Sequence, residues 1–222
     1  MSRLVKNSVR LYSSCLPFQV ERAGFYEKDE ILDLVRKNLM RDEPLIKSLK
    51  VDGRSLEGFC SRLLCDGTVL KVEDHGRIVA VGMCSTRRRG VSSALSEESK
   101  RDSEFGKILR LLAKLEVKAD VFGKYPELDT YQHGELVAVD TEYRERGLFK
   151  LIALKFEQIG IDDGSKLITS VTTGKYSKMG CLRVGWREAS TIRYSDYTED
   201  GKVVFEPESP HTEASCMIKV LA

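Results

Sequence analysis

The chain has 222 residues, of which 41% are hydrophobic and 32% are charged, which is the balance of an ordinary globular domain. Lys and Arg number 36 against 34 Asp and Glu, so the net charge is only +2. Nucleic-acid-binding proteins usually carry a concentrated basic surplus, and no apolar run approaches the roughly 18 residues of a bilayer-spanning helix. We therefore expect neither a nucleic-acid partner nor a membrane-embedded protein.

The length fits one domain, at roughly 100–200 residues per domain, and only residues 1–16 differ in composition from the rest. This segment contains Arg3, Lys6 and Arg10 but no acidic residue. Such a composition is typical of a mitochondrial targeting segment and also of a plain basic tail. We predict a basic N-terminal tail over 1–16, which is a candidate targeting segment, and a single domain over 17–222.

The six cysteines are scattered along the chain, with neither a CxxC pair nor a close Cys/His spacing. This distribution predicts no metal site. We expect reduced thiols in an intracellular protein, which is cytoplasmic unless the basic tail directs it to mitochondria.

Hydrophobic periodicity predicts three strands and three helices in the first half of the chain. The strands cover 18–23, 68–73 and 77–85, and the last two are joined by a three-residue turn at Asp74-His75-Gly76. The helices lie around 31–39, 56–64 and 105–115. The first of them should end before Pro44, because proline disfavours helical geometry in the residue ahead of it. Residues 87–99 are expected to form a polar loop in which Arg87-Arg88-Arg89 is solvated.

The second half continues with strands over 135–139, 167–171, 188–194 and 216–221, and with helices over 147–161 and 176–184. Its first strand, first helix and second strand follow one another directly along the chain. This order predicts a right-handed crossover between two parallel strands. Together the elements predict one mixed α/β domain.

The junction between the strand at 135–139 and the next helix contains Arg144, Arg146, Gly147 and Lys150. The first N–H groups of a helix have no partner within it, so this end of a helix suits a phosphate group. The same residues are also typical of a solvated basic helix start. The chain contains no GxxxxGK[ST] sequence and no GxGxxG after a predicted strand, which excludes two common phosphate loops.

The same region carries a family resemblance. Leu136-Val137-Ala138-Val139, followed by Tyr143-Arg144-Glu145-Arg146-Gly147, resembles motif A of the GNAT superfamily of N-acetyltransferases, with its loop pattern Gln/Arg-x-x-Gly-x-Gly/Ala. Other stretches resemble the arylalkylamine N-acetyltransferase-like branch known from insects and nematodes. They are Asp42-Glu43-Pro44-Leu45, Tyr176-Ser177, Val184-Gly185-Trp186, Ile192-Arg193-Tyr194-Ser195-Asp196-Tyr197 and Pro210-His211. The resemblance implies a GNAT-like α/β fold: a mixed, mostly antiparallel twisted sheet of about six to seven strands with helices on both faces.

The resemblance also implies a reaction and its participants. Acetyl-CoA would be the acetyl donor, without a metal, and a small primary amine, such as an arylalkylamine, would attack it directly in a ternary complex. The implied cofactor-binding residues are Val137, Ala138, Val139, Arg144, Arg146, Gly147, Leu148 and Lys150. Glu43 would be the base, acting through water, with Ser177 and Thr173 positioning groups or relaying protons. The expected partner is the small amine, and the expected oligomeric state is a monomer.

Two departures from the family pattern keep other interpretations open. Phe149 stands where the motif usually has Gly or Ala, and Cys181 stands where many members carry a tyrosine acid. The alternative is a GNAT-fold module without catalysis that binds an acyl-CoA or another protein. In that case Glu43 would be a solvated turn residue before Pro44, and Ser177 would be a helix N-cap or a small packing residue. Tyr194, Tyr197 and His211 either line an aromatic amine pocket or are ordinary strand-edge and loop residues.

Overall fold

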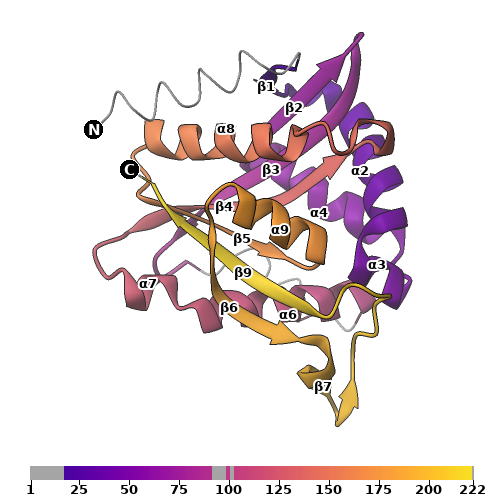
Figure 1. Cartoon of the computed structure of the whole chain (residues 1–222), viewed down its shortest axis with the longest axis vertical. Helices are drawn as coiled ribbons and strands as arrows, with labels where there is room; N and C mark the ends of the chain where they lie inside the picture. The colour runs from indigo at the N-terminus through magenta and orange to yellow at the C-terminus, as the bar shows by residue number, and fades with distance from the viewer. Residues whose placement is uncertain (1–17, 92–98, 101–102, 222) are drawn as a thin grey trace.

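The computed structural model describes residues 18–91, 99–100 and 103–221 (Figure 1). The predicted basic tail and residues 92–98 of the predicted polar loop lie outside the described residues. The strands of the main sheet are β1 (Val20–Arg22), β2 (Thr68–Asp74), β3 (Arg77–Arg88), β4 (Thr130–Val139), β5 (Leu167–Thr172), β6 (Arg187–Arg193) and β9 (Glu213–Val220). The main helices are α2 (Lys28–Asp42), α3 (Pro44–Leu49), α4 (Gly53–Asp66), α6 (Glu104–Ala119), α7 (Val121–Lys124), α8 (Leu148–Asp162) and α9 (Lys175–Arg183).

The main sheet has seven strands in the order β1-β2-β3-β4-β5-β9-β6. Strands β4 and β5 are parallel, and the remaining neighbours in this sheet are antiparallel. Helix α8 connects β4 to β5, as the predicted crossover requires. A short hairpin of β7 (Thr198–Glu199) and β8 (Lys202–Val203) forms a separate sheet. The prediction of a mixed, mostly antiparallel sheet is confirmed.

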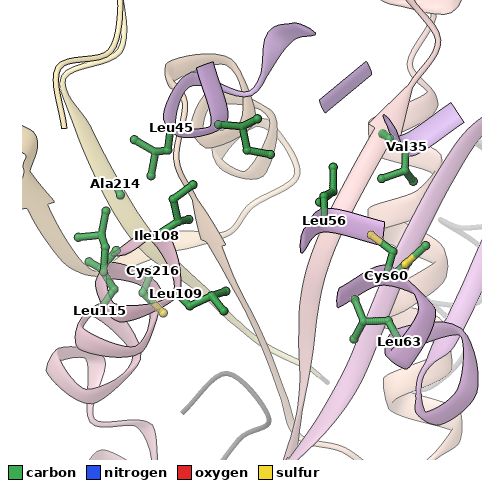
Figure 2. Close-up of a cluster of buried hydrophobic side chains, with 14 of the residues drawn as sticks. Val35, Leu45, Leu56, Cys60, Leu63, Ile108, Leu109, Leu115, Ala214 and Cys216 are labelled. Atoms are coloured by element: carbon green, nitrogen blue, oxygen red, sulfur yellow. The ribbon is translucent and has the colours of Figure 1, made fainter. Parts of the chain in front are cut away.

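Helices cover both faces of the sheet, because alternate strand residues are apolar on each side. Residues of α2, α3, α4 and α6 form the larger hydrophobic cluster on one face (Figure 1). Figure 2 shows members of this cluster from α3, α6 and β9 on one side and from α2 and α4 on the other. Residues of α8 and α9 form the second cluster on the opposite face. Among the described helices, none is long and apolar enough to cross a membrane.

The prediction that the first helix ends before Pro44 is confirmed, but a second helix, α3, begins at Pro44 itself. Proline is favoured at the first position of a helix, where its missing N–H would have no partner anyway. Glu43 is the N-cap of α3 and accepts a hydrogen bond from the Ile46 N–H. One proline therefore ends one helix and begins the next, and it places Glu43 at a fixed corner between them.

Three local predictions in the central strands are wrong. The turn after β2 has two residues, His75 and Gly76, because Asp74 already pairs with Arg77. Both turn residues have positive φ, as tight hairpin turns with two central residues in the left-handed region require. Strand β4 begins at Thr130 rather than 135, and the three-arginine segment starts inside β3, where Arg87 is buried rather than solvated.

Candidate active site

Strands β4 and β5 separate partway along their length. Their parallel pairing covers only Gln132–Gly134 on β4 and Ile168–Ser170 on β5. Strand β4 continues through Glu135–Val139, where its paired neighbour among the described strands is β3. We call this segment the open edge of β4. Its main-chain N–H and C=O groups that face away from β3 have no partner on any described strand, and such an edge can hydrogen-bond an extended ligand.

Three of the expected cofactor residues, Val137, Ala138 and Val139, lie on the open edge of β4. Ala138 is buried in the cluster beneath α2 and α6, whereas Val137 and Val139 pack against the cluster beneath α8. Their side chains therefore anchor the strand to both faces of the core. What remains for a ligand is the main chain, whose position this packing fixes.

The expected phosphate loop follows the open edge directly. The short 3-10 turn η2 (Thr141–Tyr143) leads to Gly147, which has a φ of 80° and is the N-cap of α8. This helix end has no side-chain capping hydrogen bond, so its first N–H groups suit an anion. Leu148 is only 2% exposed, and its side chain therefore belongs to the core while its main chain lies in the loop. Lys150 lies partly buried in the first turn of the helix.

Both arginines of this loop contact other protein groups. The Arg146 guanidinium lies over the Tyr143 ring, 4.8 Å from the ring centre, and the Tyr143 hydroxyl donates a 2.7 Å hydrogen bond to Asp74. Arg144 Nη2 lies 2.5 Å from Asp42 Oδ2. The Arg146 charge thus lies over an aromatic ring within the loop, whereas the Arg144 charge is paired with the Asp42 carboxylate.

Asp42 connects this loop to the expected base. It is the last residue of α2 and immediately precedes Glu43. Through Asp42, Arg144 ties the β4–α8 junction to the α2–α3 corner, although the two segments lie about a hundred residues apart in the sequence. The Arg41 side chain strengthens the link, because it donates hydrogen bonds to both Asp42 and Thr141.

Glu43 is partly buried, and both oxygens of its carboxyl group accept hydrogen bonds. Its Oε2 accepts a hydrogen bond from the Ile46 N–H at 2.5 Å, and its Oε1 accepts one from Thr173 Oγ1 at 2.6 Å. Thr173 follows β5 directly, and its carbonyl oxygen accepts a hydrogen bond from the Tyr194 hydroxyl. Burial raises the pKa of Glu43, against the opposing effect of these hydrogen bonds. The structure thus brings together Glu43 and Thr173, two of the three expected catalytic residues.

Ser177 lies near this pair but is bonded differently. Its hydroxyl donates a 2.9 Å hydrogen bond to the carbonyl oxygen of Gly174, the residue after Thr173. Gly174 is itself the N-cap of α9, so the interpretation of Ser177 as the helix cap is wrong. Ser177 occupies the first turn of α9, from which its partly buried hydroxyl faces the loop that carries Thr173.

His211 contributes to the site in a way that the sequence pattern did not predict. Its Nδ1 accepts a 3.1 Å hydrogen bond from the Lys175 N–H at the start of α9. A Cβ atom added to Gly174 would lie 3.2 Å from this nitrogen and 3.6 Å from Pro44 Cγ. Gly174 therefore allows the α2–α3 corner, the α9 start and His211 to meet closely. Burial lowers the pKa of His211, which favours its neutral ring.

The three aromatic residues near this corner fall into two groups. Tyr194 and Tyr197 are buried in the core, where both rings contact Phe205. Tyr176, in contrast, is 70% exposed and meets the His211 ring edge to face, with the ring centres 5.7 Å apart. The exposed aromatic ring near Glu43 therefore comes from Tyr176, which packs against His211.

The Phe149 ring packs between α8 and α9. A Cβ atom added to Gly180 of α9 would lie 2.8 Å from Phe149 Cε1 and 2.9 Å from Cδ1. The missing side chain of Gly180 thus creates the space that the ring fills. Phe149 is partly buried against the cluster beneath α8, so its ring contributes to helix packing.

The chain was compared with protein-family models and with solved structures. No protein-family model matches it. Among solved structures, arylalkylamine N-acetyltransferase 2 from Aedes aegypti matches 93% of this chain and 100% of its own, with a TM-score of 0.84 and 24% identity. Two further structures are similar to the chain, and each covers 92% of it and 100% of its own length with a TM-score of 0.82. They are a mosquito arylalkylamine N-acetyltransferase-like 5b, at 26% identity, and a Drosophila melanogaster polyamine N-acetyltransferase, at 24% identity. The chain has the GNAT fold, and the resemblance to the arylalkylamine N-acetyltransferase-like branch is confirmed.

Proposed function

We propose that this GNAT-fold chain transfers the acetyl group of acetyl-CoA to a small primary amine. The observation that carries the proposal is the position of Glu43 at the carboxyl ends of the separating strands. Glu43 accepts a hydrogen bond from Thr173, which directly follows β5. The open edge of β4 lies at the same end of the parallel pair. A base and a row of free main-chain donors therefore face one region, as attack on a thioester requires.

The donor half of this region fits acetyl-CoA. The main chain of Val137, Ala138 and Val139 would hydrogen-bond the extended pantetheine arm. The start of α8, with Gly147 and the Leu148 N–H, would hold the pyrophosphate, assisted by the positive charges of Arg144, Arg146 and Lys150. Acetyl-CoA supplies the activated thioester.

The acceptor half supplies the base. A primary amine is protonated at neutral pH and must lose a proton before it can attack the thioester carbonyl. Glu43, whose pKa is raised by burial, would accept this proton through a water molecule. Thr173 would keep the carboxylate oriented, and Ser177 would position the water or relay the proton. Main-chain N–H groups of the open edge would stabilise the oxyanion that forms.

Direct attack is favoured over an acetylated enzyme. A covalent route needs an activated nucleophile near the base. Burial raises the pKa of Cys181 to about 12, so its thiol stays protonated at neutral pH and is a poor nucleophile. The ternary complex, in which the amine attacks acetyl-CoA itself, is therefore the route we propose.

Two features bear on the identity of the amine. The exposed Tyr176 ring beside His211 offers an aromatic contact for an aryl group. One structural relative is a polyamine N-acetyltransferase, so cationic alkylamines form the competing class. We propose an arylalkylamine as the acceptor, because the aromatic pair lies directly against the Gly174 segment that borders Glu43.

The alternative, a GNAT-fold module without catalysis, is based on Phe149. It predicts that the ring closes the cofactor site. The contact of this ring with Gly180 argues against such a closure, because the ring has a space of its own between the two helices.

Thermal unfolding and calorimetry on the full chain with acetyl-CoA test the proposal first. Ligand at about 100 times its Kd should stabilise the protein by about 2.7 kcal/mol, which is a Tm increase of about 5–11 °C at this size. Thiol release from acetyl-CoA should then appear with tyramine or dopamine, and more slowly with spermidine or agmatine. The absence of both binding and thiol release in a folded protein would contradict the proposal and support the non-catalytic alternative.

A further inference from the structure

Strand β4 contains a β-bulge at the point where it leaves β5. The register with β3 pairs Met83 with Leu136 and Cys84 with Gly134. Glu135 is therefore an extra residue with no partner on β3. Gly134 is also the last residue of β4 that pairs with β5. Because a bulge bends its strand and increases the local twist, the conformation at Glu135 sets the direction of the open edge.

The Glu135 side chain lies in a buried polar cluster and is only 5% exposed. Its Oε1 accepts hydrogen bonds from Ser85 Oγ at 2.5 Å and from Arg87 Nη1 at 2.6 Å. Arg87 also binds the Glu116 carboxylate of α6 with two hydrogen bonds, from Nε at 3.1 Å and from Nη2 at 2.9 Å. The bulge is thus attached through one guanidinium both to β3 and to α6.

His133 and Thr169 complete the cluster on the β5 side. His133 Nδ1 lies 2.7 Å from Thr169 Oγ1, and its Nε2 lies 3.5 Å from Glu116 Oε1. Burial lowers the pKa of His133, so the ring is uncharged at neutral pH. Two carboxylates therefore share the charge of Arg87. A buried ion pair is a weak source of stability, because removing its charges from water is costly, so its placement at the bulge suggests a different role.

We propose that Glu135, Ser85 and Arg87 are positioning residues that fix the bulge and, through it, the N–H donors of the open edge. This inference rests on the proposed function, because those donors are the ones that would stabilise the oxyanion. Donors of this kind must be held within about 0.5 Å of the productive geometry. A misplacement of about 1 Å costs about 100-fold in rate. The hydrogen bonds from Ser85 and Arg87 supply this precision at Glu135, the one residue of β4 that is not paired with β3.

Two matched substitutions separate positioning from stability. Glu135→Gln and Glu116→Gln each remove one carboxylate charge that contacts Arg87, with little change in shape, so both should lower the Tm by similar amounts. Only Glu135 lies on the bulge. We expect Glu135→Gln to lower kcat by about 10- to 100-fold, and Glu116→Gln to lower it by less than about threefold. Because the open edge also holds the pantetheine arm in the proposed complex, Glu135→Gln should raise the acetyl-CoA Kd, measured by calorimetry, by a smaller factor than it lowers kcat, whereas Glu116→Gln should keep the wild-type Kd.

Equal losses of kcat in the two variants, or an unchanged kcat in Glu135→Gln, would overturn the inference. If Glu135→Gln fails to fold, Ser85→Ala replaces it, because this change removes the hydroxyl that hydrogen-bonds both Glu135 and Arg87 and leaves the Glu135–Arg87 ion pair in place. Ser85→Ala should lower kcat by a larger factor than it raises the acetyl-CoA Kd, and an unchanged kcat would again overturn the inference. A wild-type chain that neither binds acetyl-CoA nor releases thiol would overturn the proposed function and this inference with it.

Discussion

The Glu43 carboxyl group is subject to two opposing influences. Burial raises its pKa, whereas the hydrogen bond from Thr173 and those from the main chain of α3 lower it. Burial is the larger effect, so the group takes up a proton at a higher pH than an ordinary glutamate does. A raised pKa suits the proposed role of Glu43 as the base that deprotonates the amine. A carboxylate accepts a proton more readily as its pKa increases, as long as it remains deprotonated at the working pH.

Removal of the Glu43 carboxylate should abolish the acid limb of the pH profile. In the wild type, kcat/KM should rise with pH as the carboxyl group loses its proton, with a midpoint above the usual glutamate range. Glu43→Gln should lower kcat/KM by about 10²- to 10⁴-fold, the usual contribution of a general base, and should leave the acetyl-CoA Kd unchanged. Initial rates of thiol release between pH 5 and pH 9 measure this.

Thr173→Val is the matched control for this prediction. It removes the hydroxyl that lowers the Glu43 pKa but keeps the side-chain shape and the base itself. The acid limb should therefore remain and should move to higher pH. A limb that stays in Glu43→Gln, or that does not move in Thr173→Val, would assign the titration to another group.

The contact between α8 and α9 depends on a pair of residues of unequal size. Phe149 fills the space above Gly180, and a methyl group there would lie within 3 Å of the ring. Gly→Ala in an exposed helix interior normally stabilises a protein by about 1 kcal/mol. At Gly180 the overlap with the ring opposes this gain, because overpacking typically costs about 1–3 kcal/mol.

We therefore expect Gly180→Ala to lower the free energy of unfolding, as measured by urea denaturation. Gly58→Ala is the control, since Gly58 lies in α4 with nothing within 4 Å of an added Cβ, and it should stabilise the protein. Adding Phe149→Ala to Gly180→Ala should remove the overlap, so the two changes should not be additive. Stabilisation by Gly180→Ala alone would contradict the described packing.

At the scale of elements, the sequence predicts those whose apolar residues are periodic. Helices α2, α4, α6 and α8 were all expected from this pattern, and so was the parallel crossover. The first half of β4 was missed because Gln132 and His133 are polar residues that are buried by partners elsewhere in the chain. Helix α3 is only six residues long, too short for periodicity to indicate it.

The same reasoning explains which parts of the site were predictable. The family resemblance pointed to Glu43 through its Glu-Pro-Leu stretch, and a local pattern at an element boundary pointed to the loop around Gly147. The cluster around Arg87 and the contact of His211 with α9 depend on residues that are distant in the sequence. Periodicity describes only neighbours along the chain, so the three-arginine segment gave no sign that Arg87 would bind Glu116 and Glu135 in the interior.

On the scale of the whole molecule, the Asp42–Arg144 ion pair joins the proposed donor and acceptor halves of the site. Asp42→Asn and Arg144→Ala should each lower kcat/KM, and Arg144→Ala should lower it more, because this change also removes a positive charge from the proposed pyrophosphate site. The double variant should lower kcat/KM little more than Arg144→Ala alone, because both changes break the same ion pair, and coupling between contacting residues is typically about 0.5–3 kcal/mol. Kinetic measurements on the four proteins of this cycle give the coupling free energy.

The exposed Asp33–Arg36 pair on α2 is the control for this cycle. Both of its residues lie on α2, as Asp42 does, and their other ion-pair partners are Glu57 and Lys37 rather than residues of the β4–α8 junction. Asp33→Asn and Arg36→Ala should leave kcat/KM unchanged, singly and together. Additive losses at Asp42 and Arg144 would show that the two halves of the site act independently.

The order of strands in the sheet has a consequence for how the protein is made. Strand β9 lies between β5 and β6, yet it follows both of them in the sequence. While the chain emerges from the ribosome with its N-terminus first, β6 has no place in the sheet until β9 has been synthesised. The edge of β5 stays exposed for the same period, and an exposed edge invites pairing with other chains. Completion of the sheet therefore waits until β9, which is made after both of its neighbours, has been translated.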